Sequence, residues 1–139
     1  MKKIAFVFLL SLFLAGCDSG GSNNNNPYIP NYSFTVDINM DLPMYSSLQF
    51  PSNAVYIPQG IAGAKGVIVF NSGSGYYAYD AACPNQPISN CSTMAVSGIY
   101  AVCPCDEEQY SLFTGLGSLQ YPMKRYRVDV NLPIIRVYN

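Results

Sequence analysis

The chain has 139 residues, a formal net charge of −1 and no histidine. Without Lys2 and Lys3, five basic residues stand against eight acidic ones, so the remainder is weakly acidic and offers no basic patch for nucleic acid. A Ser-His-Asp triad is excluded because histidine is absent, and the sequence shows neither a phosphate-binding loop nor paired carboxylates at a catalytic spacing. The composition therefore argues against an enzyme and against a nucleic-acid-binding protein.

The first 17 residues have the three parts of an export signal. Two lysines form a charged start, an apolar run covers residues 4–14, and two small residues follow. The apolar run is too short to span a bilayer. The segment Leu14-Ala15-Gly16-Cys17 resembles the lipobox of bacterial lipoproteins. The alternative is an ordinary secreted signal that ends in a cysteine by chance.

The lipobox resemblance implies that residues 1–16 are a signal peptide and that Cys17 carries the lipid. Three fatty chains would make membrane attachment close to permanent. We therefore expect a lipid-anchored protein of the bacterial cell envelope, on the periplasmic or the cell-surface side, with the membrane as a partner.

The segment that follows Cys17 is polar. Residues 18–22 and the four asparagines after them contain no apolar side chain that could offset the entropy of ordering. We expect residues 17–33 to be the lipidated cysteine and a flexible tether. Residues 34–139 then form one domain with a core of ordinary size.

The folded part has the pattern of strands. Residues 34–40 alternate apolar and polar side chains, as in a half-buried strand. Seven further short runs rich in Val, Ile, Tyr and Phe follow, at 55–57, 67–70, 76–79, 99–102, 110–113, 126–130 and 134–138. No apolar stripe recurs at helical spacing over ten or more residues.

Turn residues separate most of these runs. Residues 71–75 and 115–117 are glycine-rich and predict hairpin turns, and residues 131–133 separate the last two strands. The fold class predicted from these patterns is a small all-β sandwich or barrel. The twelve tyrosines either stack on carbohydrate or are ordinary strand residues with a solvated hydroxyl, and the second interpretation is favoured.

Apart from Cys17, four cysteines occur in one stretch, at positions 83, 91, 103 and 105. An even number outside the cytoplasm points to disulfides. A bond between Cys103 and Cys105 across a single residue has poor geometry, which leaves two long-range pairings open. Each ties the loop at 83–91 to the loop at 103–105, and the first such bridge is worth roughly 3 kcal/mol.

Three segments resemble Rieske iron–sulfur domains. The run GVIVFNSGSGYYAYDAACP at residues 66–84 is similar to the approach to their first cluster loop, and CPCD at 103–106 is similar to the second loop. YSLFTG at 110–115 and YPMKRYRV at 121–128 resemble the closing strands. The resemblance covers residues 66–139 and implies an antiparallel Rieske-like fold with a two-loop subdomain that carries the cysteines.

In that family, two thiolates bind one iron of a [2Fe–2S] cluster and two imidazoles bind the other. The resemblance places Cys83 and Cys103 at the thiolate positions, and Asn85 and Asp106 at the histidine positions. A normal Rieske centre cannot form without histidine.

The remaining pair, Cys91 and Cys105, matches the extra cysteines that form a disulfide between the loops in high-potential Rieske proteins. The resemblance therefore implies a Cys91–Cys105 bridge. Because two thiolates on one iron must lie close together, Cys83 and Cys103 are placed to form a second bridge under oxidising conditions. We expect no cofactor and no metal.

The alternative keeps a [2Fe–2S] cluster on Cys83 and Cys103, completed by Asp106 and by either Cys91 or Cys105. The start of the chain has Lys2-Lys3 where folded-protein export uses twin arginines, which disfavours this alternative.

Two charged runs and one cysteine motif are weaker candidates for a site. Three carboxylates at residues 106–108 are typical of a solvated turn more than of a metal site, and the basic residues 124, 125 and 127 are typical of an exposed strand face more than of an anion site. A thiol–disulfide catalyst would carry Cys-X-X-Cys at a helix start, which Cys103-Pro104-Cys105 is not.

The function expected from these features is a disulfide-stabilised binding or interaction module that meets an envelope partner. The alternative function is electron transfer through an atypical cluster.

Overall fold

The computed structural model describes residues 25–139. The expected signal peptide at residues 1–16, Cys17 and most of the expected tether lie outside the described residues. Within the described part, no helix is long and apolar enough to cross a bilayer.

The described part of the chain folds into nine strands and one short 3₁₀ helix. Their bounds are β1 Thr35–Asn39, η1 Ser46–Gln49, β2 Ala54–Ile57, β3 Val67–Asn71, β4 Tyr76–Asp80, β5 Ala95–Ser97, β6 Tyr100–Val102, β7 Gln109–Ser111, β8 Arg125–Asn131 and β9 Ile134–Tyr138.

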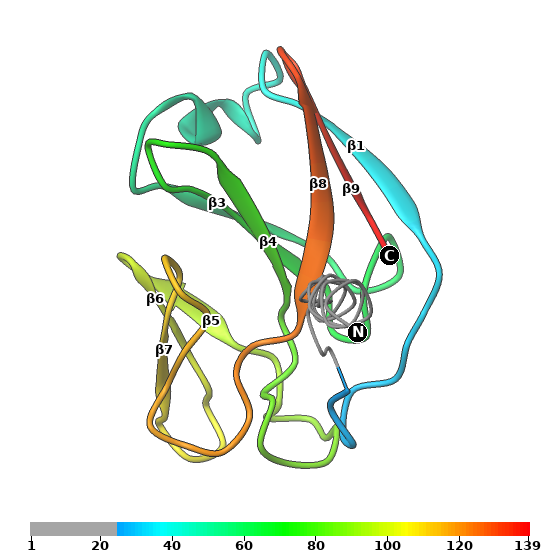
Figure 1. Cartoon of the computed structure of the whole chain (residues 1–139), viewed down its shortest axis with the longest axis vertical. Helices are drawn as coiled ribbons and strands as arrows, with labels where there is room; N and C mark the ends of the chain where they lie inside the picture. The colour runs from blue at the N-terminus through cyan, green and yellow to red at the C-terminus, as the bar shows by residue number, and fades with distance from the viewer. Residues whose placement is uncertain (1–24) are drawn as a thin grey trace, which may run out of the picture.

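The strands form two antiparallel sheets. The larger has six strands in the order β1-β9-β8-β4-β3-β2, and the smaller has three in the order β5-β6-β7. In Figure 1 the larger sheet curls through the upper part of the molecule, and the three short strands lie at the lower left. The all-β prediction is confirmed.

All five residues of strand β3 are buried. Successive strand residues point to opposite faces. Val67 and Val69 accordingly join one core, inside the curled sheet, with Ile38 and Ile135. Ile68 and Phe70 join the second core, which the small sheet and the cysteine loops cover. A run of apolar residues without alternation is the sequence pattern of such a doubly covered strand.

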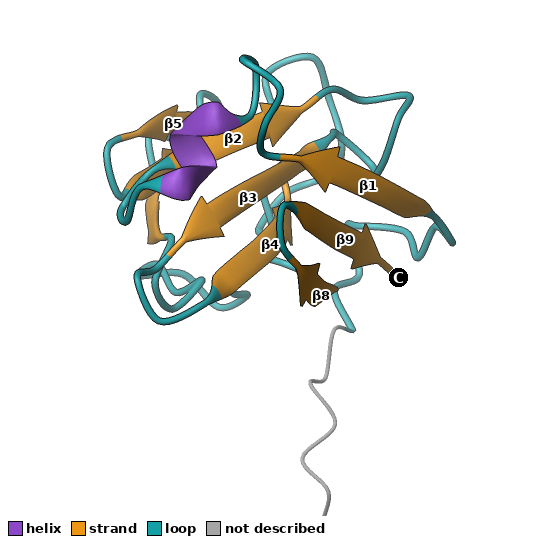
Figure 2. Ribbon diagram, turned by 90° about the horizontal axis from the view of Figure 1, so that it is seen from above, coloured by secondary structure: helices purple, strands orange, loops and turns teal. Residues whose placement is uncertain are grey.

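Helix η1 closes the first core. Figure 2 shows it lying across the sheet near β2 and β3, and its Leu48 is fully buried. One turn of 3₁₀ helix is too short to show a periodic stripe, so the sequence pattern does not predict it.

The turn predictions have mixed outcomes. Residues 71–75 form the β3–β4 hairpin turn, in which Gly73 has a φ of +87°. Residues 115–117 do not form a hairpin turn, because they lie in the connection between β7 and β8, which belong to different sheets. Strand β5 was not predicted, because its three residues are exposed and too few to show alternation.

Candidate functional site

Two loops bring the four cysteines together. The first connects β4 to β5 and the second connects β6 to β7. The Sγ atoms of Cys83 and Cys103 are bonded at 2.09 Å, with their Cα atoms 5.6 Å apart. Cys91 and Cys105 are bonded at 2.04 Å, with their Cα atoms 5.2 Å apart. This is the pairing that the Rieske resemblance implied.

The buried carboxylate of Asp80, at the end of β4, fixes the direction of the first loop. It accepts hydrogen bonds from the amides of Ala64 at 2.5 Å and Ala82 at 2.7 Å. It also accepts one from the hydroxyl of Tyr126 at 2.6 Å. Gly63 has a φ of +72°, and a Cβ there would lie 2.8 Å from the Asp80 carboxylate. These contacts turn the chain sharply between β4 and Cys83.

Backbone hydrogen bonds hold both loops in place. The amide of Cys83 donates to the carbonyl of Ser92 at 2.8 Å, and that of Met94 donates to Ala81 at 2.7 Å. In the second loop, the amide of Cys103 donates to the carbonyl of Glu108 at 2.9 Å. Backbone hydrogen bonds therefore close each cysteine loop, and the two bridges join one loop to the other.

The two bridges differ in exposure. Cys83 and Cys103 are 1% and 0% exposed and belong to the second core. Cys91 is exposed and Cys105 is half-buried. We call Cys83–Cys103 the inner bridge and Cys91–Cys105 the outer bridge. The Sγ atom of Cys105 lies within 4.8 Å of both sulfur atoms of the inner bridge.

Asn85, at the first histidine position, makes structural hydrogen bonds. Its Nδ2 donates to the hydroxyl of Tyr110 at 2.9 Å and to the carbonyl of Tyr121 at 2.8 Å. Its Oδ1 accepts the amide of Tyr121 at 2.8 Å. Burial raises the pKa of the Tyr110 hydroxyl, and the hydrogen bond from Asn85 acts against that shift. The Asn85 side chain thus ties the first cysteine loop to β7 and to the segment before β8.

Asp106, at the second histidine position, is exposed. Its Oδ1 accepts the amide of Glu108 at 3.1 Å, as in an Asx turn. Glu108 in turn accepts the hydroxyl of Ser118 at 2.7 Å, and hydrogen bonds from Ser118 lower the pKa of the Glu108 carboxyl. The acidic run at 106–108 is therefore a hydrogen-bonded surface turn.

Gln86 was not singled out from the sequence. Its Nε2 donates to the Sγ of Cys103 at 2.9 Å and lies 3.5 Å from Asp106 Oδ2. No motif flags it, because a glutamine in a loop is most often solvent-exposed.

The structure corrects the expected start of the domain. Ile29 is 2% exposed and packs against Ala64 and Ala82, and Asn26 Nδ2 donates to the carbonyl of Pro84 at 2.7 Å. Residues 26–31 thus belong to the folded domain, which was expected to begin at residue 34. The sequence pattern does not indicate that these residues are folded, because the segment is mostly polar and a single isoleucine supplies its buried contact.

Lys124 is buried at 2% exposure, although the basic residues there were expected on an exposed strand face. Its Nζ donates to the carbonyls of Ile29 at 3.4 Å and Pro30 at 3.1 Å, and to Asn31 Oδ1. Burial lowers the pKa of the Lys124 ammonium, while nearby Asp80 acts in the opposite direction. Arg125 and Arg127 are exposed, as expected.

The residues present do not fit a Rieske cluster. Cys83 and Cys103, which the resemblance places at the thiolate positions, are bonded to each other in the inner bridge. The amide of Asn85 is occupied by Tyr110 and Tyr121, and the chain has no imidazole to bind the second iron.

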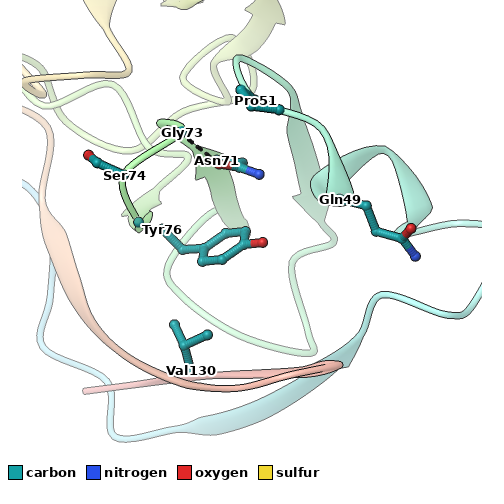
Figure 3. Close-up of a pocket in the computed structure, with 8 residues that line it drawn as sticks. Gln49, Pro51, Asn71, Gly73, Ser74, Tyr76 and Val130 are labelled. Atoms are coloured by element: carbon teal, nitrogen blue, oxygen red, sulfur yellow. Dashed lines mark hydrogen bonds between the residues drawn. The ribbon is translucent and has the colours of Figure 1, made fainter.

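A second candidate site lies at the opposite end of the larger sheet. A hollow of about 480 Å³ lies beside the β3–β4 turn. Gln49, Tyr76 and Val130 are among the residues that line it (Figure 3). A neighbouring hollow of about 430 Å³ shares Gln49 and Tyr76 and is bordered by Leu132. Gln49 Nε2 donates to the Met40 carbonyl at 2.8 Å. The Tyr76 hydroxyl lies 3.3 Å from the Leu48 carbonyl.

No family model and no curated protein matches the sequence of this chain. Solved structures do match its fold. The fold is similar to a chain in the complex of reduced oxygenase and oxidized ferredoxin in carbazole 1,9a-dioxygenase, with a TM-score of 0.50 and 18% identity over 77% of this chain and 94% of that one.

Two further solved structures match with TM-scores below 0.50. The Escherichia coli protein NirD matches with a TM-score of 0.47 and 20% identity over 78% of this chain and 98% of that one. The apo form of the quaternary ammonium Rieske monooxygenase CntA matches with a TM-score of 0.49 and 12% identity, over 79% of this chain and 33% of that one. The described part of the chain therefore has a Rieske-like fold, in which Cys83 and Cys103 are bonded to each other.

Proposed function

We propose that this protein is a lipid-anchored envelope protein whose Rieske-like domain is a disulfide-stabilised binding module without an iron–sulfur cluster. The inner bridge is the observation that carries the proposal, because a covalent bond between Cys83 and Cys103 leaves no thiolate at either cluster position. The absence of histidine from the sequence supports the same conclusion.

The start of the described chain and the two hollows lie at opposite ends of the domain, which supports a binding role. The described chain starts at the cysteine end, where Asn26 contacts Pro84, and this start lies at the bottom of Figure 1 in blue. The two hollows lie beside the β3–β4 and β8–β9 turns, which are at the top of the same view. An anchor on Cys17 would therefore join the domain at its cysteine end and leave the hollows at the far end.

Exposed apolar side chains around the hollows support the same assignment. Val130 is 49% exposed and Leu132 is 64% exposed, and both border a hollow. Apolar side chains that gather at a concave surface are typical of interaction sites. The polar groups of Gln49 and Tyr76 already contact backbone carbonyls, which favours an apolar contact there over hydrogen-bonded recognition of a sugar.

The absence of a cluster is tested by assaying iron and acid-labile sulfide in the purified full chain, together with its visible spectrum. The proposal predicts a colourless protein without either element. Iron and sulfide in equal amounts, with visible absorption bands, would replace the proposal with the electron-transfer alternative. That alternative draws on the closeness of Cys83, Cys103 and Cys105, whose sulfur atoms all lie within 4.8 Å of one another.

The anchor is tested by growing cells that produce the full chain with a labelled fatty acid. Label is expected on the wild-type protein and none on Cys17→Ser, which has no thiol at position 17 to be lipidated. Equal labelling of both forms would contradict lipid attachment at Cys17.

The binding role is tested by placing a photo-crosslinking amino acid at Leu132, with the same amino acid at exposed Arg127 as the matched control. The proposal predicts a discrete adduct with an envelope protein from position 132 and none from position 127. The reverse pattern would place the interaction surface elsewhere.

A further inference from the structure

One sulfur atom of the outer bridge lies close to both sulfur atoms of the inner bridge. The Sγ of Cys105 in the outer bridge lies within 4.8 Å of the Sγ atoms of Cys83 and Cys103. Thiol–disulfide exchange requires a thiolate to reach a disulfide sulfur. When the outer bridge opens, rotation of the Cys105 side chain can bring its sulfur into contact with the inner bridge.

The bridges differ in their accessibility to a reductant. Cys91 is exposed, whereas Cys83 and Cys103 are 1% and 0% exposed. A dithiol in solution therefore meets Cys91 first. The inner bridge can be reached only from within the protein, and Cys105 is the cysteine beside it.

Each bridge has a hydrogen-bond donor at one of its sulfur atoms. Gln86 Nε2 donates to Cys103 Sγ at 2.9 Å. The Ser89 hydroxyl lies 3.4 Å from Cys91 Sγ and 3.7 Å from Cys105 Sγ. A disulfide sulfur has no proton, so the hydroxyl is the donor. A hydrogen bond favours the charged thiolate over the thiol, and a stabilised thiolate leaves faster in exchange.

The geometry points to a thiol–disulfide relay. In this relay a dithiol reduces the outer bridge, and the released Cys105 thiolate then attacks the inner bridge at Cys83. This inference rests on the proposed function, because a cluster on Cys83 and Cys103 would leave no inner bridge. Its substrate class is a protein or small-molecule dithiol.

The relay balances as a two-electron reduction. One thiolate of the dithiol attacks Cys91 Sγ, the Cys91–Cys105 bond breaks, and Cys105 leaves as a thiolate. The second thiol of the reductant then displaces Cys91, so the reductant ends as a disulfide and Cys91 as a thiol.

The second half of the relay is internal. The Cys105 thiolate attacks Cys83 Sγ, the Cys83–Cys103 bond breaks, and a Cys83–Cys105 bond forms. Cys103 leaves as a thiolate, accepts the hydrogen bond of Gln86 and is protonated from solvent, which received a proton when the attacking thiol of the dithiol ionised. The product has one bridge and two thiols, at Cys91 and Cys103.

Cys83 is the favoured point of attack for two reasons. Attack on Cys103 would join it to Cys105 across the single residue Pro104, which suits a disulfide poorly. Attack on Cys83 instead releases Cys103, the sulfur that already accepts a hydrogen bond.

The test compares two full-chain variants that lose the same outer bridge. Cys91→Ser leaves Cys105 free beside the inner bridge, and Cys105→Ser leaves only Cys91 free, which is not part of the group of three close sulfur atoms. Each variant is equilibrated with a trace of dithiothreitol and quenched in acid. Free thiols are then labelled with one alkylating agent, and the remaining cysteines with a second agent after reduction. Fragment masses assign the first label to individual cysteines.

In the Cys91→Ser variant, the relay predicts that the first alkylating agent labels Cys103 more than Cys105. In the Cys105→Ser variant, it predicts that this agent labels Cys91 alone. Gln86→Leu combined with Cys91→Ser should move the label from Cys103 back to Cys105. First label on Cys105 alone in Cys91→Ser would overturn the relay.

The wild-type chain gives a second measurement that does not depend on how the variants fold. With one equivalent of dithiothreitol, the relay predicts first label on Cys91 and Cys103, whereas independent bridges give first label on Cys91 and Cys105. Iron and sulfide are assayed in the same samples. Their presence would reject the proposed function, while an iron-free protein with independent bridges would reject the relay alone.

Discussion

The side-chain amide of Asn85 donates a hydrogen bond to the hydroxyl of Tyr110 over 2.9 Å, at the position where the Rieske resemblance places a histidine. The same side chain exchanges hydrogen bonds with the backbone of Tyr121. This residue has become part of the structure that joins the cysteine loop to the sheet.

Asn85→Leu is expected to lower the free energy of unfolding by about 2 kcal/mol, because it leaves partly buried partners on Tyr110 and Tyr121 without hydrogen bonds. Urea denaturation measures the change. Asn90→Leu, at an exposed position of the same loop, is the matched control and should change stability little. Equal losses of stability in both variants would show that the hydrogen bonds of Asn85 do not stabilise the fold.

Asp80→Asn is expected to destabilise the protein by about 3 kcal/mol. The amide keeps only one acceptor oxygen and turns an NH₂ group toward donors such as Ala64 and Tyr126. Asp129→Asn, at an exposed position in β8, is the control. If Asp80→Asn lowers the free energy of unfolding less than Asp129→Asn does, the direction of the loop does not depend on the Asp80 carboxylate.

Stability is expected to fall as the pH rises above about 10, because burial raises the pKa of the Tyr79 hydroxyl to about 12. Between the ordinary pKa near 10 and that value, the unfolded chain loses the Tyr79 proton and the folded chain keeps it. The folded state therefore binds more protons, and stability declines by up to about 1.4 kcal/mol per pH unit for this group.

The comparison of wild type with Tyr79→Phe isolates this effect. Lys124 acts with the opposite sign, because its pKa is lowered in the folded state and stability rises as the folded chain loses that proton first. Urea denaturation between about pH 9 and about pH 11 should show a shallower decline for Tyr79→Phe than for wild type. Identical slopes would contradict the assignment.

Ile29→Ala is expected to cost about 2 kcal/mol of stability, since Ile29 packs against Ala64 and Ala82. Tyr32→Ala, directly after this segment and 51% exposed, is the control. If neither substitution changes the urea midpoint, residues 26–31 do not belong to the folded domain.

Patterns along the chain predicted most of the larger sheet. The alternation at 35–39 and the unbroken apolar run at 67–70 depend on local spacing, which a sheet imposes directly. The turn residues at 71–75 also act locally. The resemblance to Rieske domains supplied the pairing of the cysteines, which spacing alone left open between two arrangements.

Long-range polar contacts could not be predicted in the same way. The burial of Lys124 depends on carbonyls of Ile29 and Pro30, which are far away in the sequence and leave no periodic trace. The contact of Gln86 with Cys103 joins two loops whose approach is set by the fold. Such contacts become visible only when the tertiary structure brings the groups together.

The most direct test of the central claim is a count of free thiols in the mature full chain, denatured without reductant and measured beside its visible spectrum. Two bridges and a lipidated Cys17 predict no free thiol and no visible absorption, with four thiols appearing after reduction. Free thiols at Cys83 and Cys103 before reduction, or visible bands that vanish on acid treatment, would contradict the disulfide-bonded, cluster-free domain.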